Sequence, residues 1–232
     1  MIGKKESRRE PWSCVPGPLN ERAPGIMSDS HNKRPVARHG VLFMHVPKTG
    51  GVSLLNTDIA SRIDRKIHSL SKDLDIAATI RDLGAADSFK FAFVRNPYDR
   101  LVSLYHYFFT MTPDHPFYAY NEHFIPRIQA RRSFREFCQA LPSEGYRNNF
   151  HFLPQTRYTH SRGVSVLDYM GRYEQLDRHI GDVARLLDVT FAQTPHLNRS
   201  EHDHYRNYFD ARSRQIVETL YEEDLDLLAY DF

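Results

Sequence analysis

Short apolar runs and longer helical patterns follow one another along the chain. Apolar runs of strand length occupy residues 41–46, 89–94 and 164–170. Between and after these runs, apolar residues recur at nearly helical spacing over residues 52–63, 71–83, 97–108 and 176–187. Strands that alternate with helices are typical of α/β chains, in which helices cover a mostly parallel sheet. We therefore predict an α/β fold with a central, mostly parallel sheet.

Capping residues predict where the helices begin and end. The expected N-terminal caps are Ser71, Asp210 and Ser133, the last in a capping box with Glu136. Pro97 favours the first turn of a helix, and Gly84 favours the end of one. Residues 111–131 and 142–163 lack a clear period, so we expect irregular structure there.

The first candidate site follows the first strand. His45-Val46-Pro47-Lys48-Thr49-Gly50-Gly51 leads into a helical pattern that starts at Val52. A glycine loop between a strand and a helix directs backbone N–H groups toward an anion, so we expect phosphate binding at Lys48, Thr49, Gly50, Gly51, Val52 and Ser53. The lysine precedes the glycines, unlike that of the nucleotide-triphosphate loop, and the magnesium-holding geometry of that loop is not evident. A plain turn is the alternative.

The second candidate site follows the strand at 89–94. Arg95 lies at the end of this strand, and Ser103 lies two turns into the next helix. The ends of parallel strands open onto a common crevice, where ligands of such folds bind. An arginine fork with a hydroxyl is suited to a phosphate group. The alternatives are an ion pair of Arg95 with Asp99 or Glu174, and a Ser103 hydroxyl that faces solvent or bonds to a preceding carbonyl.

Composition limits the class of protein. The 232 residues, 41% hydrophobic and 26% charged, are ordinary for one soluble domain. We predict no transmembrane segment, no signal peptide and, from only two cysteines, Cys14 and Cys138, a cytoplasmic location. The excess of basic over acidic residues lies in residues 1–40, and the remainder has a net charge of −2. We predict residues 1–40 to be a disordered tail, with Met27 as an alternative native start. We expect no nucleic-acid partner.

Both motifs resemble those of the nucleotide-sulfate sulfotransferases, in particular the carbohydrate-type branch that includes the heparan sulfate 2-O-sulfotransferases. His45–Gly51 is similar to the 5′-phosphosulfate loop of that family, and Phe93–Ser103 to its 3′-phosphate motif. Further matches are Pro154-Gln155, Gly171–Glu174, His196–Ser200 and Tyr221–Phe232. The resemblance spans residues 41–232, which we expect to form a single domain.

The resemblance implies a P-loop-like three-layer fold and the donor 3′-phosphoadenosine 5′-phosphosulfate (PAPS), with adenosine 3′,5′-bisphosphate (PAP) as product and no metal requirement. It implies transfer of the sulfuryl group to an acceptor hydroxyl or amine, with a carbohydrate-like acceptor favoured. Lys48 would stabilise the leaving phosphate, and Arg95 and Ser103 would read the 3′-phosphate. Arg199 and Ser200 lie where the C-terminal nucleotide loop of the family is expected.

A histidine is the expected general base, because its pKa suits neutral pH. We choose His68, which lies between the two motifs, as the catalytic histidines of the carbohydrate branch do; His45 and His106 are the alternatives. The aromatic segment 111–124 is expected to line the acceptor site. His202-Asp203-His204 is interpreted as surface rather than as a metal site, for want of a third ligand.

Two other functions remain open from the sequence. A small-molecule kinase would use the same kind of phosphate loop, but the lysine position and the lack of an obvious magnesium-holding aspartate count against it. A catalytically inactive nucleotide-binding protein is the second alternative, because only His68 stands where the carbohydrate branch shows a His-x-His pair. The identity of the acceptor and the oligomeric state are not encoded in any pattern that we identify.

Overall fold

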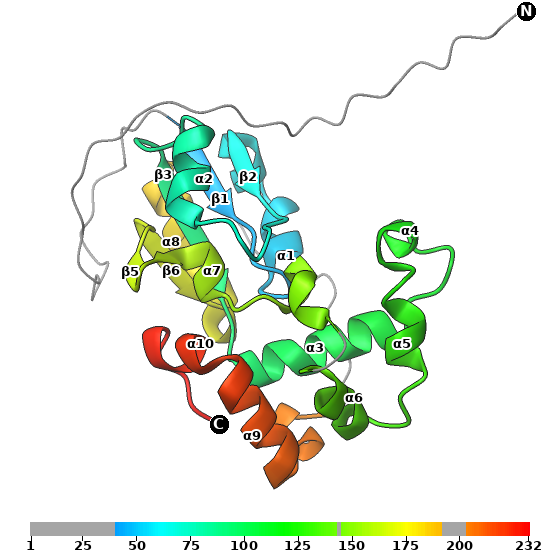
Figure 1. Cartoon of the computed structure of the whole chain (residues 1–232). Helices are drawn as coiled ribbons and strands as arrows, with labels where there is room; N and C mark the ends of the chain where they lie inside the picture. Colours follow the sequence, from blue (N-terminus) through cyan, green and yellow to red (C-terminus); the bar gives the residue numbers. More distant parts are fainter. Residues whose placement is uncertain (1–39, 143–144, 192–202) are drawn as a thin grey trace, which may run out of the picture.

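A parallel four-stranded sheet forms the centre of the fold. The computed structural model describes residues 40–142, 145–191 and 203–232. The strands are β1 (Val41–Met44), β2 (Arg65–Ile67), β3 (Phe89–Val94) and β6 (Tyr169–Arg172), in the spatial order β2-β1-β3-β6 (Figure 1). All three pairings are parallel, with Phe43 beside Phe91 and Phe93 beside Gly171. The prediction of an α/β fold with a central parallel sheet is confirmed.

Helices cover both faces of this sheet. Leu42 and Met44 point to the face covered by α2 (Ile76–Asp82) and α7 (Thr156–Thr159). Phe43 and the phenylalanines of β3 point to the opposite face, covered by α1 (Gly51–Leu55), the 3-10 turn η1 (Asp58–Arg62) and α8 (Leu176–Leu186). Successive strand residues alternate between the two faces, so each layer receives its own apolar side chains. The result is a three-layer arrangement.

A separate helical lobe lies beyond the carboxyl ends of the strands (Figure 1). It is built on α3 (Pro97–Phe109) with α4 (Tyr118–Asn121), α5 (Ile125–Gln129), α6 (Phe134–Ala140), α9 (Ala211–Leu220) and α10 (Glu222–Leu227). Its core is a third apolar cluster centred on α3, which includes Phe108, Phe137 and Phe152. The remaining elements are the hairpin of β4 (His160–Ser161) with β5 (Val164–Ser165), and the turns η2 (Tyr146–Asn148), η3 (Phe150–Phe152), η4 (Tyr173–Gln175) and η5 (Tyr205–Tyr208).

The strongest local signals predicted their elements correctly. β3 spans residues 89–94, and α3 begins at Pro97 with the Asn96 side chain accepting from the Tyr98 N–H at 3.0 Å. The Ser133 hydroxyl accepts from the Glu136 N–H at the start of α6. Asp210 and Ser213 form a capping box at the start of α9. In each case the cap satisfies N–H groups that have no partner within the helix.

The expected helix over 52–63 is wrong, because α1 ends at Leu55. The Asn56 side chain donates to the Val52 carbonyl at 2.8 Å, and the Thr57 hydroxyl donates to the Leu54 carbonyl at 2.7 Å. Such local side-chain bonds compete with continuation of the helix. The turn η1 and the strand β2 follow. β2 was not predicted, since Arg65 and Lys66 give it a polar sequence at the edge of the sheet.

Three other boundaries also differ. The second helix begins at Ile76 with Asp75 as its cap rather than Ser71, although Gly84, with φ 61°, ends it as expected. The expected strand over 164–170 is divided into β5 and β6, because Asp168 between them exchanges hydrogen bonds with the Lys90 backbone. Residues 111–131 contain α4 and α5 rather than only irregular structure.

Within the described residues, no helix is long and apolar enough to cross a membrane. The tail at residues 1–39, together with its alternative start at Met27, lies outside the described part, so these two expectations remain predictions.

Candidate functional site

The loop between β1 and α1 presents a row of unpaired backbone donors. In the described part of the chain, no backbone N–H from Lys48 to Val52 donates a hydrogen bond. Two left-handed residues shape the loop, Lys48 with φ 67° and Gly50 with φ 87°. The buried Thr49 hydroxyl donates to the Val46 carbonyl at 2.9 Å, which closes the turn. Consecutive free N–H groups in a turn of this kind form a cradle suited to an anion.

Both glycines of the loop are required by their surroundings. A Cβ atom at Gly50 would lie 2.5 Å from a methyl carbon of Leu176, in addition to its positive φ. A Cβ atom at Gly51 would lie 2.2 Å from the imidazole ring of His45. The loop therefore packs directly against α8 on one side and against His45 on the other. The Val52 side chain is 45% exposed to solvent, so we expect Val52 to contribute to the anion cradle through its backbone N–H only.

Replacing Gly51 by alanine tests this close approach. We expect Gly51→Ala to destabilise the fold by about 1–3 kcal/mol, the usual cost of overpacking. The double variant Gly51→Ala/His45→Ala removes the ring that the new methyl group meets, so it should recover part of that loss. Urea unfolding of both single variants and the double variant measures the coupling. Strictly additive effects would contradict the packing seen between Gly51 and His45.

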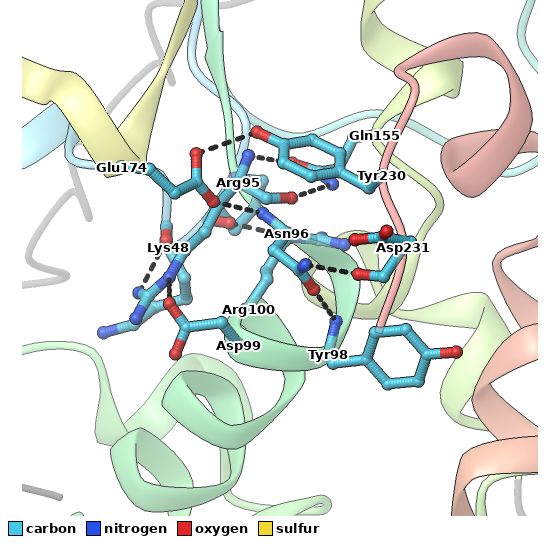
Figure 2. A network of polar contacts seen from close by, with 11 residues as sticks. Lys48, Arg95, Asn96, Tyr98, Asp99, Arg100, Gln155, Glu174, Tyr230 and Asp231 are labelled. Carbon is cyan, nitrogen blue, oxygen red and sulfur yellow. Dashed lines mark hydrogen bonds and ion pairs between the residues drawn. The ribbon is translucent and has the colours of Figure 1, made fainter. Parts of the chain in front are cut away.

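Two arginines from the second motif hold this loop. Arg95 Nη1 donates to the Lys48 carbonyl at 3.3 Å, and Arg100 Nε donates to the Pro47 carbonyl at 3.0 Å. Figure 2 shows Arg95 beside Lys48, with Arg100 below them on α3. Arg100 is 1% exposed and also donates through Nη2 to the His151 and Leu153 carbonyls. The two motifs, about 50 residues apart in the sequence, therefore form one structural unit.

Arg95 is fixed by its neighbours on every side. Its Nε donates to Asp99 at 2.8 Å, and its guanidinium lies 4.0 Å above the Tyr173 ring. Its backbone N–H and carbonyl both bond to the side chain of Gln155. Of the two acids considered from the sequence, Asp99 is the ion-pair partner. Glu174 instead accepts from the Asn96 N–H and the Tyr230 hydroxyl (Figure 2).

The Arg95–Asp99 pair leaves much of the arginine fork unused. A guanidinium has five N–H donors, and the described chain occupies only those at Nε and Nη1. Ser103 lies one turn beyond Asp99 on the same face of α3. It is 2% exposed, and its hydroxyl has no hydrogen-bond partner among the described residues. Neither alternative for Ser103, solvent exposure or a backward bond, is seen.

Lys48 carries an ammonium group that no described carboxylate neutralises. Its Nζ lies 4.4 Å from the centroid of the Tyr107 ring. Burial, with the nearby charge of Arg95 as a second cause, lowers the pKa of Lys48 to about 8. At neutral pH the group is still mostly protonated. An unneutralised lysine beside free N–H groups fits an anionic ligand, whose charge would stabilise the protonated form.

Three histidines gather next to the loop. The ring centroids of His45 and His68 are 4.4 Å apart, and those of His68 and His151 are 6.4 Å apart. Burial is the main cause that lowers the pKa of His68 to about 4 and that of His151 to about 3, and it also lowers the pKa of His45. His106 is separate from this cluster, because its Nε2 bonds to the Tyr208 hydroxyl at 2.9 Å in the helical lobe.

His151 and Arg100 were missed by the sequence analysis. His151 lies four residues before Gln155 in the segment His151-Phe152-Leu153-Pro154-Gln155, and only the Pro154-Gln155 pair of that segment drew attention. A histidine so close to a matched motif is the signal that was available. Arg100 stands inside the matched motif Phe93–Ser103, but its role in holding the loop gave no signal, since its three acceptors come from segments distant in sequence.

These neutral histidines predict acid instability. Because their pKa values are depressed in the fold, the unfolded chain binds more protons between pH 6.5 and about 4. Stability is therefore fully present above pH 6.5 and lost as the pH falls, by up to about 1.4 kcal/mol per pH unit for each histidine. Urea midpoints between pH 7.5 and 5 measure this slope. His68→Phe should flatten it, and an unchanged slope in that variant would contradict the assignment.

Of the remaining site candidates from the sequence, some lie in the described structure and others lie outside it. Ser53 is buried in α1, whereas Arg199, Ser200 and His202 lie outside the described residues. Within the described part, no group of three or more histidine, cysteine, aspartate or glutamate side chains is arranged to hold a metal ion. In the aromatic segment, Phe117 is 57% and Tyr120 is 74% exposed.

Comparison with known protein families indicates the function of this site. A model of the sulfotransferase family matches residues 36–231, which includes every described element. No curated protein matches the chain.

Proposed function

The chain belongs to the sulfotransferase family, and from this premise we propose that it transfers the sulfuryl group of PAPS to an acceptor hydroxyl or amine. The observation that carries the proposal is the bond from Arg95 to the Lys48 carbonyl. This bond places the free N–H groups of the first motif next to the unused guanidinium donors of the second. A donor with phosphate groups at both its 5′ and 3′ positions requires two such anion sites side by side.

We assign the 5′-phosphosulfate to Lys48 and the amides of Thr49, Gly50, Gly51, Val52 and Ser53. The 3′-phosphate is assigned to Arg95, through its unused Nη donors, and to the Ser103 hydroxyl. Among the described residues, neither Arg95 Nη2 nor the Ser103 hydroxyl has a hydrogen-bond partner, so both can serve a ligand. Arg199 and Ser200 are retained as additional nucleotide-binding candidates on the basis of the family resemblance.

The chemistry follows from the charges. As the acceptor oxygen or nitrogen bonds to sulfur, the bond from sulfur to the bridging phosphate oxygen breaks, and negative charge grows on that phosphate. Lys48 and the loop amides stabilise this charge. The acceptor proton passes to a histidine of the cluster that contains His45, His68 and His151, and His68 is the candidate chosen from the sequence. None of these steps draws on a metal ion.

A carbohydrate-like acceptor is our preferred class. The exposed rings of Phe117 and Tyr120 give the segment 111–124 flat apolar surfaces, on which sugar rings pack well. This segment precedes and includes α4, in the same lobe as α3, the helix that carries Ser103 and Tyr107. The cytoplasm stays the predicted compartment, on the cysteine content alone.

Labelled donor tests the proposal directly. PAPS carrying radioactive sulfur is incubated with the chain and one of three acceptors: a desulfated polysaccharide, a glycolipid or 2-naphthol. We expect transfer of label to the polysaccharide, an equal amount of PAP, and no effect of a magnesium chelator. Magnesium-dependent phosphate transfer from ATP would instead support a kinase. PAP binding without any turnover of PAPS, even to water, would support an inactive nucleotide-binding protein.

A further inference from the structure

We propose that His151, held by Asn149, is the histidine that accepts the proton of the acceptor group, through its Nε2 atom. The inference rests on the proposed sulfuryl transfer and names a residue that the sequence analysis did not consider. In this assignment His151 is a catalytic residue and Asn149 is its positioning residue.

The hydrogen bonds of Asn149 determine which ring nitrogen of His151 carries the proton. One side-chain atom, Asn149 Oδ1, accepts from the His151 backbone N–H at 2.9 Å and lies 2.8 Å from His151 Nδ1. An atom that accepts from a backbone N–H is the amide oxygen, so Nδ1 must be the donor in the second bond. The neutral ring then has its lone pair on Nε2, which is the form a general base requires.

The surroundings of His151 keep this ring neutral and in place. The cationic groups that face it are Lys48 and Arg100, and its titratable neighbours are His45, His68 and Tyr107. Arg100 anchors its carbonyl at 2.7 Å, and the same arginine holds the phosphate loop at Pro47. The Tyr107 ring lies 6.2 Å from that of His151 and carries the Lys48 ammonium at 4.4 Å. His151 is therefore fixed beside the group that would bind the leaving phosphate.

His68 and His45 have the opposite hydrogen-bond state. In both rings Nδ1 is sealed from solvent and has no hydrogen-bond partner among the described residues, whereas His151 Nδ1 has Asn149 Oδ1 as its partner. A proton on a sealed Nδ1 would leave a buried donor unsatisfied, so the proton of each neutral ring is better placed on Nε2. His68 then acts as a hydrogen-bond donor, and it does not accept the proton. This division of roles revises the choice of His68 as the base.

The proposed step is balanced without any further reagent. The acceptor O–H or N–H bond breaks, its proton goes to His151 Nε2, and the acceptor atom bonds to sulfur. The sulfur–oxygen bond to the nucleotide breaks, and its electron pair stays on the phosphate of PAP. The imidazolium afterwards returns the proton to solvent.

The tautomer can be measured without knowing the acceptor. Long-range proton–nitrogen NMR on the uniformly 15N-labelled chain at pH 7.5 distinguishes protonated from unprotonated ring nitrogens, and His151→Asn identifies the His151 signals. We expect an unprotonated Nε2 in His151 and a protonated Nε2 in His68. A protonated Nε2 in His151 would overturn the proposal.

Turnover supplies the second arm, with PAPS as donor and water or desulfated polysaccharide as acceptor. His151→Asn keeps an amide donor near the Nδ1 position and removes the base, so PAP release should fall about 100-fold or more. The matched control His106→Asn changes a histidine in the helical lobe and should keep wild-type turnover. If His151→Asn turns over at the wild-type rate, the proposal fails.

Two variants of Asn149 distinguish a role in positioning His151 from a role in packing alone. Asn149→Ala should reduce turnover, whereas Asn149→Asp can still accept from Nδ1 and should restore it. The added carboxylate should also move the acidic limb of the pH–rate profile to higher pH, since it stabilises the protonated ring. Calorimetric binding of PAP is measured for every variant. If the wild-type chain does not bind PAP, the proposed function is refuted. If His151→Asn binds PAP normally and turns over PAPS at the wild-type rate, only this inference is refuted.

Discussion

Replacing Lys48 by methionine is expected to lower the rate of sulfuryl transfer about 100- to 1,000-fold, the usual effect of removing one preorganised charge-stabilising donor. The Lys48 ammonium has no described ion-pair partner and lies next to the free N–H groups of the loop. Methionine keeps a similar stem against the Tyr107 ring but carries no charge. PAPS turnover under saturating donor measures the effect.

Stability should respond in the opposite way. Because burial and Arg95 disfavour the charged form of Lys48, removing the charge should leave the unfolding free energy unchanged or raised. Lys90→Met is the matched control, because its ammonium is paired with Asp168 at 3.4 Å and donates to two backbone carbonyls. That variant should lose stability and keep turnover. A Lys48→Met chain with wild-type turnover would contradict the role given to Lys48.

Arg100→Met is expected to destabilise the fold by about 3–5 kcal/mol, which is typical of removing a buried charged group that makes three hydrogen bonds. The substitution leaves the carbonyls of Pro47, His151 and Leu153 without their donor. Each is a buried acceptor, and an unsatisfied one costs about 1–3 kcal/mol. Urea unfolding, monitored by far-ultraviolet circular dichroism, measures the loss of unfolding free energy.

Arg157 provides the matched control for Arg100. It also donates to two backbone carbonyls, those of Lys72 and Leu74, but these bonds are exposed to solvent. Water replaces the donor there, so Arg157→Met should cost about 1 kcal/mol. Equal losses in the two variants would show that the burial of Arg100 contributes nothing. PAP binding should weaken only in Arg100→Met, because that side chain holds the phosphate loop.

The elements that the sequence predicted best are those with their determinants close together. β3 is a run of aromatic and other apolar residues, interrupted only by Lys90 and bounded by Arg95, and α3 has both Pro97 and a capping Asn96. β2 was not predicted, because its strand conformation comes from pairing with β1 and not from its own residues. The helix ends after Leu55 because of two local side-chain hydrogen bonds. The helical spacing of apolar residues continues past this point, so the sequence predicted a longer helix.

The candidate site divides in the same way. Lys48, Arg95 and Ser103 stand in recognisable local patterns, and the fold brings Lys48 and Arg95 into contact. The partners of Arg95 and the burial of Arg100 depend on which distant segments meet, and sequence spacing carries no such information. His151 joins His45 and His68 only through the fold, although its bond to Asn149 is local.

The central claim is that the two motifs form one donor site that reads a 3′-phosphate. Calorimetric titration with PAP and, separately, with ADP, both without magnesium, tests it most directly. We predict tight PAP binding, weak ADP binding, and loss of PAP binding in Arg95→Ala. Ser103→Ala removes a hydroxyl with no described partner, so it should fold normally and weaken PAP binding about 10-fold. Equal binding of ADP, or binding only with magnesium, would contradict the account.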